Sequence, residues 1–74
     1  AQAGDYPKAE RHYRLALPGR DTAETHNGLG YVLARQGRTQ DAIAEYRRAI
    51  DIDPKFAPAC NNLAQELTRQ GKLD

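Results

Sequence analysis

Few side chains in this sequence could act as nucleophiles, bases or metal ligands. The chain has two histidines, His12 and His26, and a single cysteine, Cys60. A cysteine next to a histidine can be an activated nucleophile, and the same two residue types bind zinc. A metal site would need further ligands, however, and neither histidine has a plausible nucleophile as its partner. We therefore expect His12 to lie on the surface, and His26 and Cys60 to be packing residues, with Cys60 a small buried one.

The carboxylates and glycines also lack a catalytic arrangement. A general acid–base pair needs two carboxylates that converge in a pocket, but the acidic residues are scattered along the sequence. We expect the following on helix surfaces and at helix ends: Glu24, Asp41, Glu45, Asp51, Asp53 and Glu66. The run Gly28-Leu29-Gly30 is too short for a nucleotide-binding loop. The sequence therefore predicts no catalytic, cofactor-binding or metal-binding residues, and a protein that is not an enzyme.

The composition indicates one small soluble domain. The chain has 74 residues, of which 39% are apolar and 28% are charged, and its net charge is +1. Such balanced charge gives no reason to expect nucleic acid or an anionic membrane as a partner. No apolar run approaches the roughly 18 residues of a membrane span, and the first residues do not resemble a signal peptide. A single cysteine excludes an intramolecular disulfide, so a cytoplasmic location is expected.

The sequence repeats itself. The tripeptide Arg-Gln-Gly occurs twice, with its copies 34 residues apart. With this shift, seven of the eighteen residues in 23–40 are identical to those in 57–74. With a shift of 33 residues, five of the fourteen residues in 4–17 are identical to those in 37–50. A period of this length is typical of repeat proteins, whose units stack on one another.

Each half of the repeated unit has the pattern of an amphipathic helix. Apolar or small residues recur at helical spacing, as Leu29, Gly30 and Leu33 do in one half, and Ala42 and Tyr46 in the other. The small residues at 30 and 42 let two helices approach closely, so a large residue at either should cost about 1–3 kcal/mol. Helices are predicted over residues 5–17, 23–36, 40–52 and 57–70.

The ends of these helices carry recognisable signals. Asp21 or Thr22 can cap the helix that begins at residue 23, and Thr39 can cap the next one. Asp53 and Pro54 should end that helix, because proline disfavours a helical residue before it. The glycines expected in a left-handed conformation at these boundaries are Gly4, Gly37 and Gly71.

The run from Gly28 to Pro54 resembles a tetratricopeptide repeat, a family with one helix pair in roughly every 34 residues. The positions that match are Leu29, Gly30, Ala42, Tyr46, Ala49 and Pro54. The resemblance implies an all-α fold in which antiparallel helix-turn-helix repeats stack as a right-handed α-solenoid. The helix order is B–A–B–A, where A and B are the first and second helix of a unit. The single segment 1–74 then comprises a second helix with its linker (1–22), a complete repeat (23–56) and the first helix of a truncated repeat (57–74).

Because such arrays are curved, the resemblance also implies a concave groove lined by first helices, which binds a peptide or a partner segment. The residues predicted to line it are Glu24, Asn27, Tyr31 and Arg35 from one unit, and Asn61, Gln65 and Arg69 from the next. Ala34, Pro58 and Thr68 fall on the same faces. Asparagine can donate to and accept from a peptide backbone, arginine can bind a carboxylate, and tyrosine offers a rigid aromatic contact.

The function implied is a non-catalytic scaffold for protein–protein interaction, with a protein or peptide partner and without cofactor, nucleic acid or membrane insertion. Two alternatives remain open. The chain could recruit substrates for a larger enzyme, since Asn61-Asn62-Leu63-Ala64 is similar to repeats of O-linked N-acetylglucosamine transferases. It could also be a structural spacer, or self-associate through its terminal helices.

Self-association has a physical motive, because the first and last helices each lack a neighbour. The apolar residues expected to remain partly uncovered are Tyr6, Ala9, Tyr13, Leu63 and Leu67. About three repeats are usually needed for a stable array. The isolated chain is therefore expected to be marginally stable or to associate.

Overall fold

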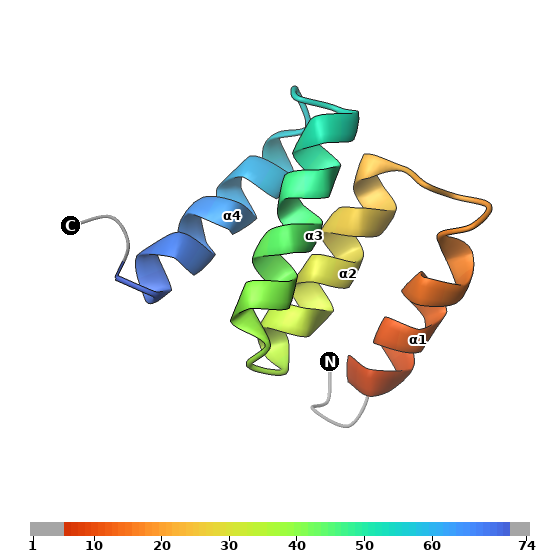
Figure 1. The fold of residues 1–74 in the computed structure, drawn as a ribbon, viewed down its shortest axis with the longest axis horizontal. Helices are drawn as coiled ribbons and strands as arrows, with labels where there is room; N and C mark the ends of the chain where they lie inside the picture. The colour runs from red at the N-terminus through yellow and green to blue at the C-terminus, as the bar shows by residue number, and fades with distance from the viewer. Residues whose placement is uncertain (1–5, 72–74) are drawn as a thin grey trace.

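The computed structural model describes residues 6–71, which form four helices. They are α1 (Tyr6–Ala16), α2 (Ala23–Arg35), α3 (Thr39–Ile52) and α4 (Ala57–Arg69) (Figure 1). Each helix begins and ends within one residue of its predicted bounds. Residues 6–71 contain no strand, so the all-α prediction is confirmed.

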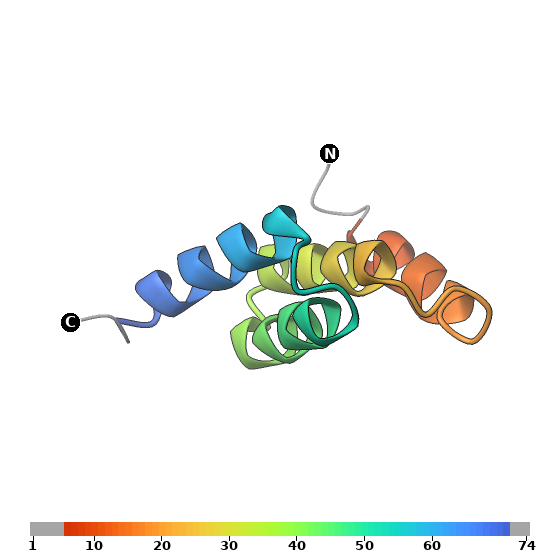
Figure 2. The same ribbon diagram turned by 90° about the horizontal axis from the view of Figure 1, so that it is seen from above.

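Helices that follow one another in the chain lie side by side in space (Figure 1). The contact between α2 and α3 is the most extensive, α1 packs against α2, and α4 packs against α3 and also touches α2. Seen from above, α2 and α4 lie in one layer and α3 lies in a second layer beneath them (Figure 2). This sequential stacking confirms the predicted helical-repeat solenoid, in which each unit contacts only its neighbours.

The turn between α2 and α3 is closed by a left-handed glycine. Gly37 has a φ of +82°, and its amide N–H donates to the carbonyl oxygen of Ala34 at 3.0 Å. The N–H of Arg38 donates to the carbonyl oxygen of Leu33, also at 3.0 Å. These two bonds constitute a Schellman motif, which satisfies the last carbonyls of α2. The left-handed conformation predicted for Gly37 is therefore confirmed.

The other helix C-termini also match their signals. Gly71 follows α4 with a φ of +73°, and its N–H donates to the carbonyl oxygen of Thr68 at 2.9 Å. Helix α3 ends directly before Asp53 and Pro54, as predicted. The third glycine of the series, Gly4, lies outside the described residues.

The caps at the helix N-termini match the prediction only in part. Thr22, one of the two candidates, caps α2, since its Oγ1 accepts from the N–H of Thr25 at 3.2 Å. The other candidate, Asp21, has a different partner that is described below. The predicted cap Thr39 is wrong: it is the first residue of α3, and Arg38 occupies the N-cap without a side-chain hydrogen bond. Arg38 is the last residue of the Schellman motif, and its own carbonyl oxygen accepts the first hydrogen bond of α3, from the N–H of Ala42 at 3.0 Å. Helix α3 therefore begins one residue earlier than predicted, at Thr39.

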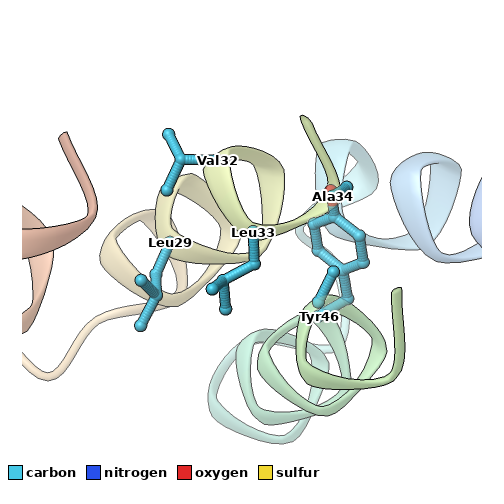
Figure 3. Packing of buried hydrophobic residues seen from close by; sticks show 6 residues of the cluster. Leu29, Val32, Leu33, Ala34 and Tyr46 are labelled. Atoms are coloured by element: carbon cyan, nitrogen blue, oxygen red, sulfur yellow. The ribbon is translucent and has the colours of Figure 1, made fainter. Parts of the chain in front are cut away.

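The core lies between α2 and α3 (Figure 3). Leu29, Leu33 and Tyr46 are fully buried. Figure 3 shows the two leucines pointing from α2 toward α3, and the ring of Tyr46 pointing from α3 back toward α2. This ring lies against Gly30, and Ala42 is fully buried beside it. The predicted close approach of the two helices at these small residues is therefore confirmed.

Helix α1 is attached less tightly than the others. None of its residues is buried. Tyr6, Ala9 and Tyr13 are half-buried and pack against the core residues of α2. The ring of Tyr13 lies against Gly28, which has no side chain to obstruct it.

An ion-pair network adds a polar attachment between α1 and the α2–α3 turn. Glu10 accepts from Gln36 Nε2 at 3.0 Å, from Arg38 Nη1 at 3.0 Å and from Arg14 Nε at 2.9 Å. The hydrogen bond from Gln36 is the largest reason that the pKa of Glu10 lies below its ordinary value, and both arginines add to the effect. The carboxylate of Glu10 is thus ionised and holds three donors together.

Candidate functional site

The seven residues predicted to bind a partner lie on two helices that touch, α2 and α4. We call this surface the α2–α4 face; its members are Glu24, Asn27, Tyr31, Arg35, Asn61, Gln65 and Arg69. All of them are exposed except Asn27, which is half-buried. Both helices lie in the same layer, above α3 (Figure 2). The structure therefore brings the two predicted sets onto adjacent helices.

A hydrogen bond between side-chain amides connects the two helices of this face. Asn62 Nδ2 donates to Asn27 Oδ1 at 2.9 Å, and both residues are half-buried. The sequence repeat pairs Asn27 with Asn61, but its hydrogen-bonding partner is the next residue along. Asn62 was missed as a member of the site because its equivalent in the preceding unit is Gly28.

An aromatic and a cationic side chain lie together on α2. Tyr31 is 47% exposed, and the guanidinium carbon of Arg35 is 5.9 Å from the centre of its ring. A cation over an aromatic face at this distance is attracted to it. Hydrogen bonding with Tyr6, followed by the influence of Tyr31, raises the pKa of Arg35 above its ordinary value. The pair thus presents a fixed positive charge beside an exposed ring.

On α4, the guanidinium of Arg69 forms an ion pair with a buried carboxylate. Glu66 Oε2 lies 3.2 Å from Arg69 Nη1, whereas Glu66 Oε1 is buried and has no hydrogen-bond partner within residues 6–71. The prediction of a surface position for Glu66 is wrong, since the residue is 5% exposed. Burial is the main cause that raises the pKa of Tyr46 to about 12, and the charge of Glu66 adds to it. Glu66 therefore faces the core rather than a ligand.

Of the three residues expected beside the face, two are exposed and one is buried. Pro58 and Thr68 are exposed, and the hydroxyl of Thr68 donates to the carbonyl oxygen of Ala64 at 2.9 Å. Ala34, by contrast, is 4% exposed, so its predicted place on the face is wrong. It belongs to the core cluster against which Leu63 of α4 packs.

The histidine expected to be a packing residue has two polar partners. His26 is 6% exposed; its Nδ1 lies 2.7 Å from Glu45 Oε1 and its Nε2 lies 2.5 Å from Asp21 Oδ1. Glu45 was expected on the surface, but it is 8% exposed. Its helical spacing relative to Ala42 and Ala49, both fully buried, could have indicated an inward position.

Cys60 does not share the surroundings of its counterpart His26. It is exposed, so the prediction of a small buried cysteine is wrong. In the first turns of α4 only Ala59 is buried, and it packs together with Ala23 and Ala49. Within residues 6–71, no three His, Cys, Asp or Glu side chains converge in a way that could hold a metal ion. None of the four helices is long and apolar enough to cross a membrane.

Comparison with known proteins gives related chains that are much longer. The Arabidopsis thaliana protein "Tetratricopeptide repeat domain-containing protein PYG7, chloroplastic" is 26% identical over 73 residues, 92% of this chain and 24% of that protein. The peroxisomal targeting signal receptor of Eremothecium gossypii is 41% identical over 61 residues, 81% of this chain and 11% of the receptor. The chain thus spans a quarter or less of the length of these relatives. No solved structure gives a significant match.

The family itself is identified by a direct match. The tetratricopeptide repeat model matches residues 1–55. The four stacked helices are the architecture that the resemblance implied, and two of its matching positions, Gly30 and Tyr46, lie against each other. Repeats of this kind generally mediate protein–protein interactions. The chain belongs to the tetratricopeptide repeat family.

Proposed function

We propose that the chain is a non-catalytic interaction module that binds an extended segment of a protein partner on the α2–α4 face. We also propose that residues 23–56 are its complete repeat, preceded by the second helix and linker of one unit (1–22) and followed by the first helix of another (57–74). The observation that carries the binding proposal is the hydrogen bond between Asn27 and Asn62.

This bond orients two amides from different helices and leaves each with a free group. The NH₂ of Asn27 and the side-chain oxygen of Asn62 have no hydrogen-bond partner within residues 6–71. They are one donor and one acceptor, and an extended peptide unit offers one carbonyl oxygen and one N–H. A partner strand can therefore bond to both amides through its backbone, which gives affinity with little dependence on its sequence.

The side chains around this pair supply the specificity. Tyr31 offers an exposed aromatic surface of low conformational freedom, and Arg35 and Arg69 lie toward the C-terminal ends of their helices. Two guanidinium groups near one end of the face favour a segment that carries a carboxylate there. The likeness to a protein named as a targeting signal receptor supports recognition of a short segment.

Selection of peptides from a random displayed library, followed by binding measurements on variants, tests the proposal. The double change Tyr31→Ala with Arg35→Ala should weaken the binding of the selected peptides about thirtyfold, because truncating aromatic and arginine side chains that anchor a partner costs about 2 kcal/mol. The matched control is Gln40→Ala with Arg47→Ala, which removes two exposed side chains from α3. Both variants should retain the helical circular dichroism of the wild type.

The proposal is rejected if the selected peptides bind the Tyr31 and Arg35 variant as tightly as the wild type. It is also rejected if only the α3 control loses binding, since the partner would then occupy the opposite side of the array.

A further inference from the structure

The two arginines of the α2–α4 face occupy equivalent positions in consecutive units, but they have different neighbours. The guanidinium carbon of Arg35 lies 5.9 Å from the centre of the Tyr31 ring. The residue equivalent to Tyr31 in the next unit is Gln65, which has no ring. There the neighbour is Glu66, whose Oε2 accepts from Nη1 of Arg69 at 3.2 Å. Each arginine therefore has a side chain on its own helix that restricts its guanidinium group.

The carboxylate of Glu66 lowers the stability of the fold where it lies. Its side chain is 6% exposed, and its Oε1 has no hydrogen-bond partner within residues 6–71. Burial of a polar atom without a partner is unfavourable. The equivalent residue of the preceding unit is Val32, which is just as buried, so the packing accepts an apolar side chain at this position. A costly residue that the fold does not require indicates a role in function.

The ion pair leaves one edge of the Arg69 guanidinium group unused. Only Nη1 donates to Glu66. Nε and Nη2, whose N–H groups point in the same direction, form no hydrogen bond within residues 6–71. Such an edge binds a carboxylate through two parallel hydrogen bonds. The side chain of Arg69 is 56% exposed, so a partner can reach this edge.

Glu66 also determines the net charge at this end of the face. Arg35 and Arg69 each contribute one positive charge and Glu66 one negative charge, which leaves +1. Hydrogen bonding with Tyr6 is the main cause that raises the pKa of Arg35, and the charge of Glu66 is a smaller one, so the carboxylate acts on both arginines. A carboxylate ligand carries one negative charge, whereas a phosphate group carries nearly two at neutral pH. The carboxylate is therefore the anion whose charge this end of the face balances.

We propose that Glu66 is a positioning residue, which holds Arg69 and makes the α2–α4 face select a segment with a carboxylate over one with a phosphate group. This inference rests on the binding function proposed above. An Asp or Glu side chain and the C-terminus of a chain all supply the required carboxylate.

Synthetic peptides test the selectivity. Peptides selected on the wild-type chain from a random displayed library are resynthesised with each acidic residue as Glu, Gln or phosphoserine. Each is made with a free and with an amidated C-terminus, which separates the two sources of the carboxylate. The wild type should bind the carboxylate form about tenfold more tightly than its uncharged counterpart. It should bind the phosphoserine form no more tightly than the carboxylate form.

Glu66→Gln tests the part played by the charge, because glutamine keeps the size of the side chain and an oxygen that accepts from Arg69. The affinity for phosphoserine relative to carboxylate should rise about threefold to tenfold, since a second negative charge on the ligand is no longer repelled. The matched control is Asp41→Asn, which removes the charge from an ion pair of similar length with Arg38 on α3. This control should leave the relative affinity unchanged.

Glu66→Val tests the positioning of Arg69, because valine removes the hydrogen bond as well as the charge. NMR of the guanidinium groups measures the rotation about the Cζ–Nε bond. In the wild type, this rotation should be slower in Arg69 than in Arg47, an exposed arginine of α3. In Glu66→Val the two rates should become equal. Equal rates already in the wild type would overturn the positioning role.

The selectivity is overturned if Glu66→Gln and the wild type discriminate equally between the two anions, or if the selected peptides bind without a carboxylate. If those peptides still bind the Tyr31 and Arg35 variant more weakly, the face binds the partner and only the role of Glu66 is wrong. If they bind that variant as tightly as the wild type, the proposed function fails as well. Glu66→Val serves for the same comparison of anions if Glu66→Gln does not fold.

Discussion

A β-carbon added to Gly30 would lie 2.7 Å from Cε1 of the Tyr46 ring. That ring is 1% exposed, and the carbonyl oxygen of Ala42 lies 3.1 Å from the same added atom. Neither a buried ring nor a helix backbone can move aside without disturbing its own packing. The absence of a side chain at this position therefore determines how closely α2 and α3 approach each other.

Gly30→Ala should accordingly lower the free energy of unfolding by about 1–3 kcal/mol, as overpacking does in other cores. Urea unfolding followed by circular dichroism measures this change. The control is Gly28→Ala, whose added atom would lie 2.5 Å from the Tyr13 ring. Tyr13 is half-buried and can shift outward, and alanine favours a helix over glycine by about 1 kcal/mol. Equal losses in the two variants would contradict the assignment of Gly30 as the close contact.

Gly37→Ala tests the left-handed turn after α2. Apart from the two adjacent residues, no atom of residues 6–71 lies within 4 Å of the β-carbon that this change would add, so the expected cost is backbone strain. A non-glycine residue at a φ of +82° should lose about 1 kcal/mol of stability. Gly37→Asn should lose less, because asparagine adopts this conformation more readily. If thermal unfolding shows the same loss for alanine and asparagine, strain at this φ is not the cause.

Glu66→Val should stabilise the chain. Glu66 stands 34 residues after Val32, and both are 5% exposed. Valine at this position would remove a buried carboxylate oxygen that has no partner among the described residues. Replacing a buried ion pair with an apolar residue often stabilises a protein, here by about 1 kcal/mol. Urea unfolding measures the difference.

The complementary change at this ion pair is Arg69→Ala. It leaves the carboxylate of Glu66 without its cation, so the free energy of unfolding should decrease by about 1 kcal/mol. We expect no larger loss because the Arg69 side chain is 56% exposed. Glu66→Val could instead lower the free energy of unfolding, with an unchanged slope of that free energy against urea concentration. This result would mean that the carboxylate stabilises the fold.

Alkaline pH should destabilise the chain through Tyr46. Burial raises the pKa of this tyrosine to about 12, whereas an unfolded tyrosine ionises near about 10. Between these two values the unfolded chain releases a proton that the folded chain retains, so stability falls by at most about 1.4 kcal/mol per pH unit. Between about pH 9 and 11, the melting temperature of Tyr46→Phe should therefore fall less than that of the wild type. Identical slopes for the two proteins would show that Tyr46 ionises equally in both states.

The helices and their closest contact could be predicted from the sequence because their determinants lie close together in the chain. A glycine at 37, a proline at 54 and apolar residues at helical spacing are sufficient to define the bounds of α2 and α3. The small residues Gly30 and Ala42 likewise indicated where two helices meet. These signals depend on backbone sterics and on the period of the helix, which are the same in every context.

The polar contacts could be predicted only in part, because they depend on how neighbouring helices cross. The repeat aligns Asn27 with Asn61, but the crossing of α2 and α4 places Asn62 against it. Glu45 was expected in water, since carboxylates are rarely buried without a partner. That partner, His26, stands 19 residues away in the sequence. A local pattern carries no signal for such a pairing.

The modest attachment of α1 has a consequence for the cooperativity of the molecule. In a linear array the free energy of each helix is nearly the sum of its own term and one coupling term to each neighbour. For α1 the coupling comes from half-buried tyrosines and the carboxylate of Glu10, whereas α2 and α3 share fully buried leucines. Amide hydrogens of α1 should therefore exchange through a local opening, and those of α2 and α3 only when the whole chain unfolds. Hydrogen exchange would then divide the chain into two foldons of unequal stability.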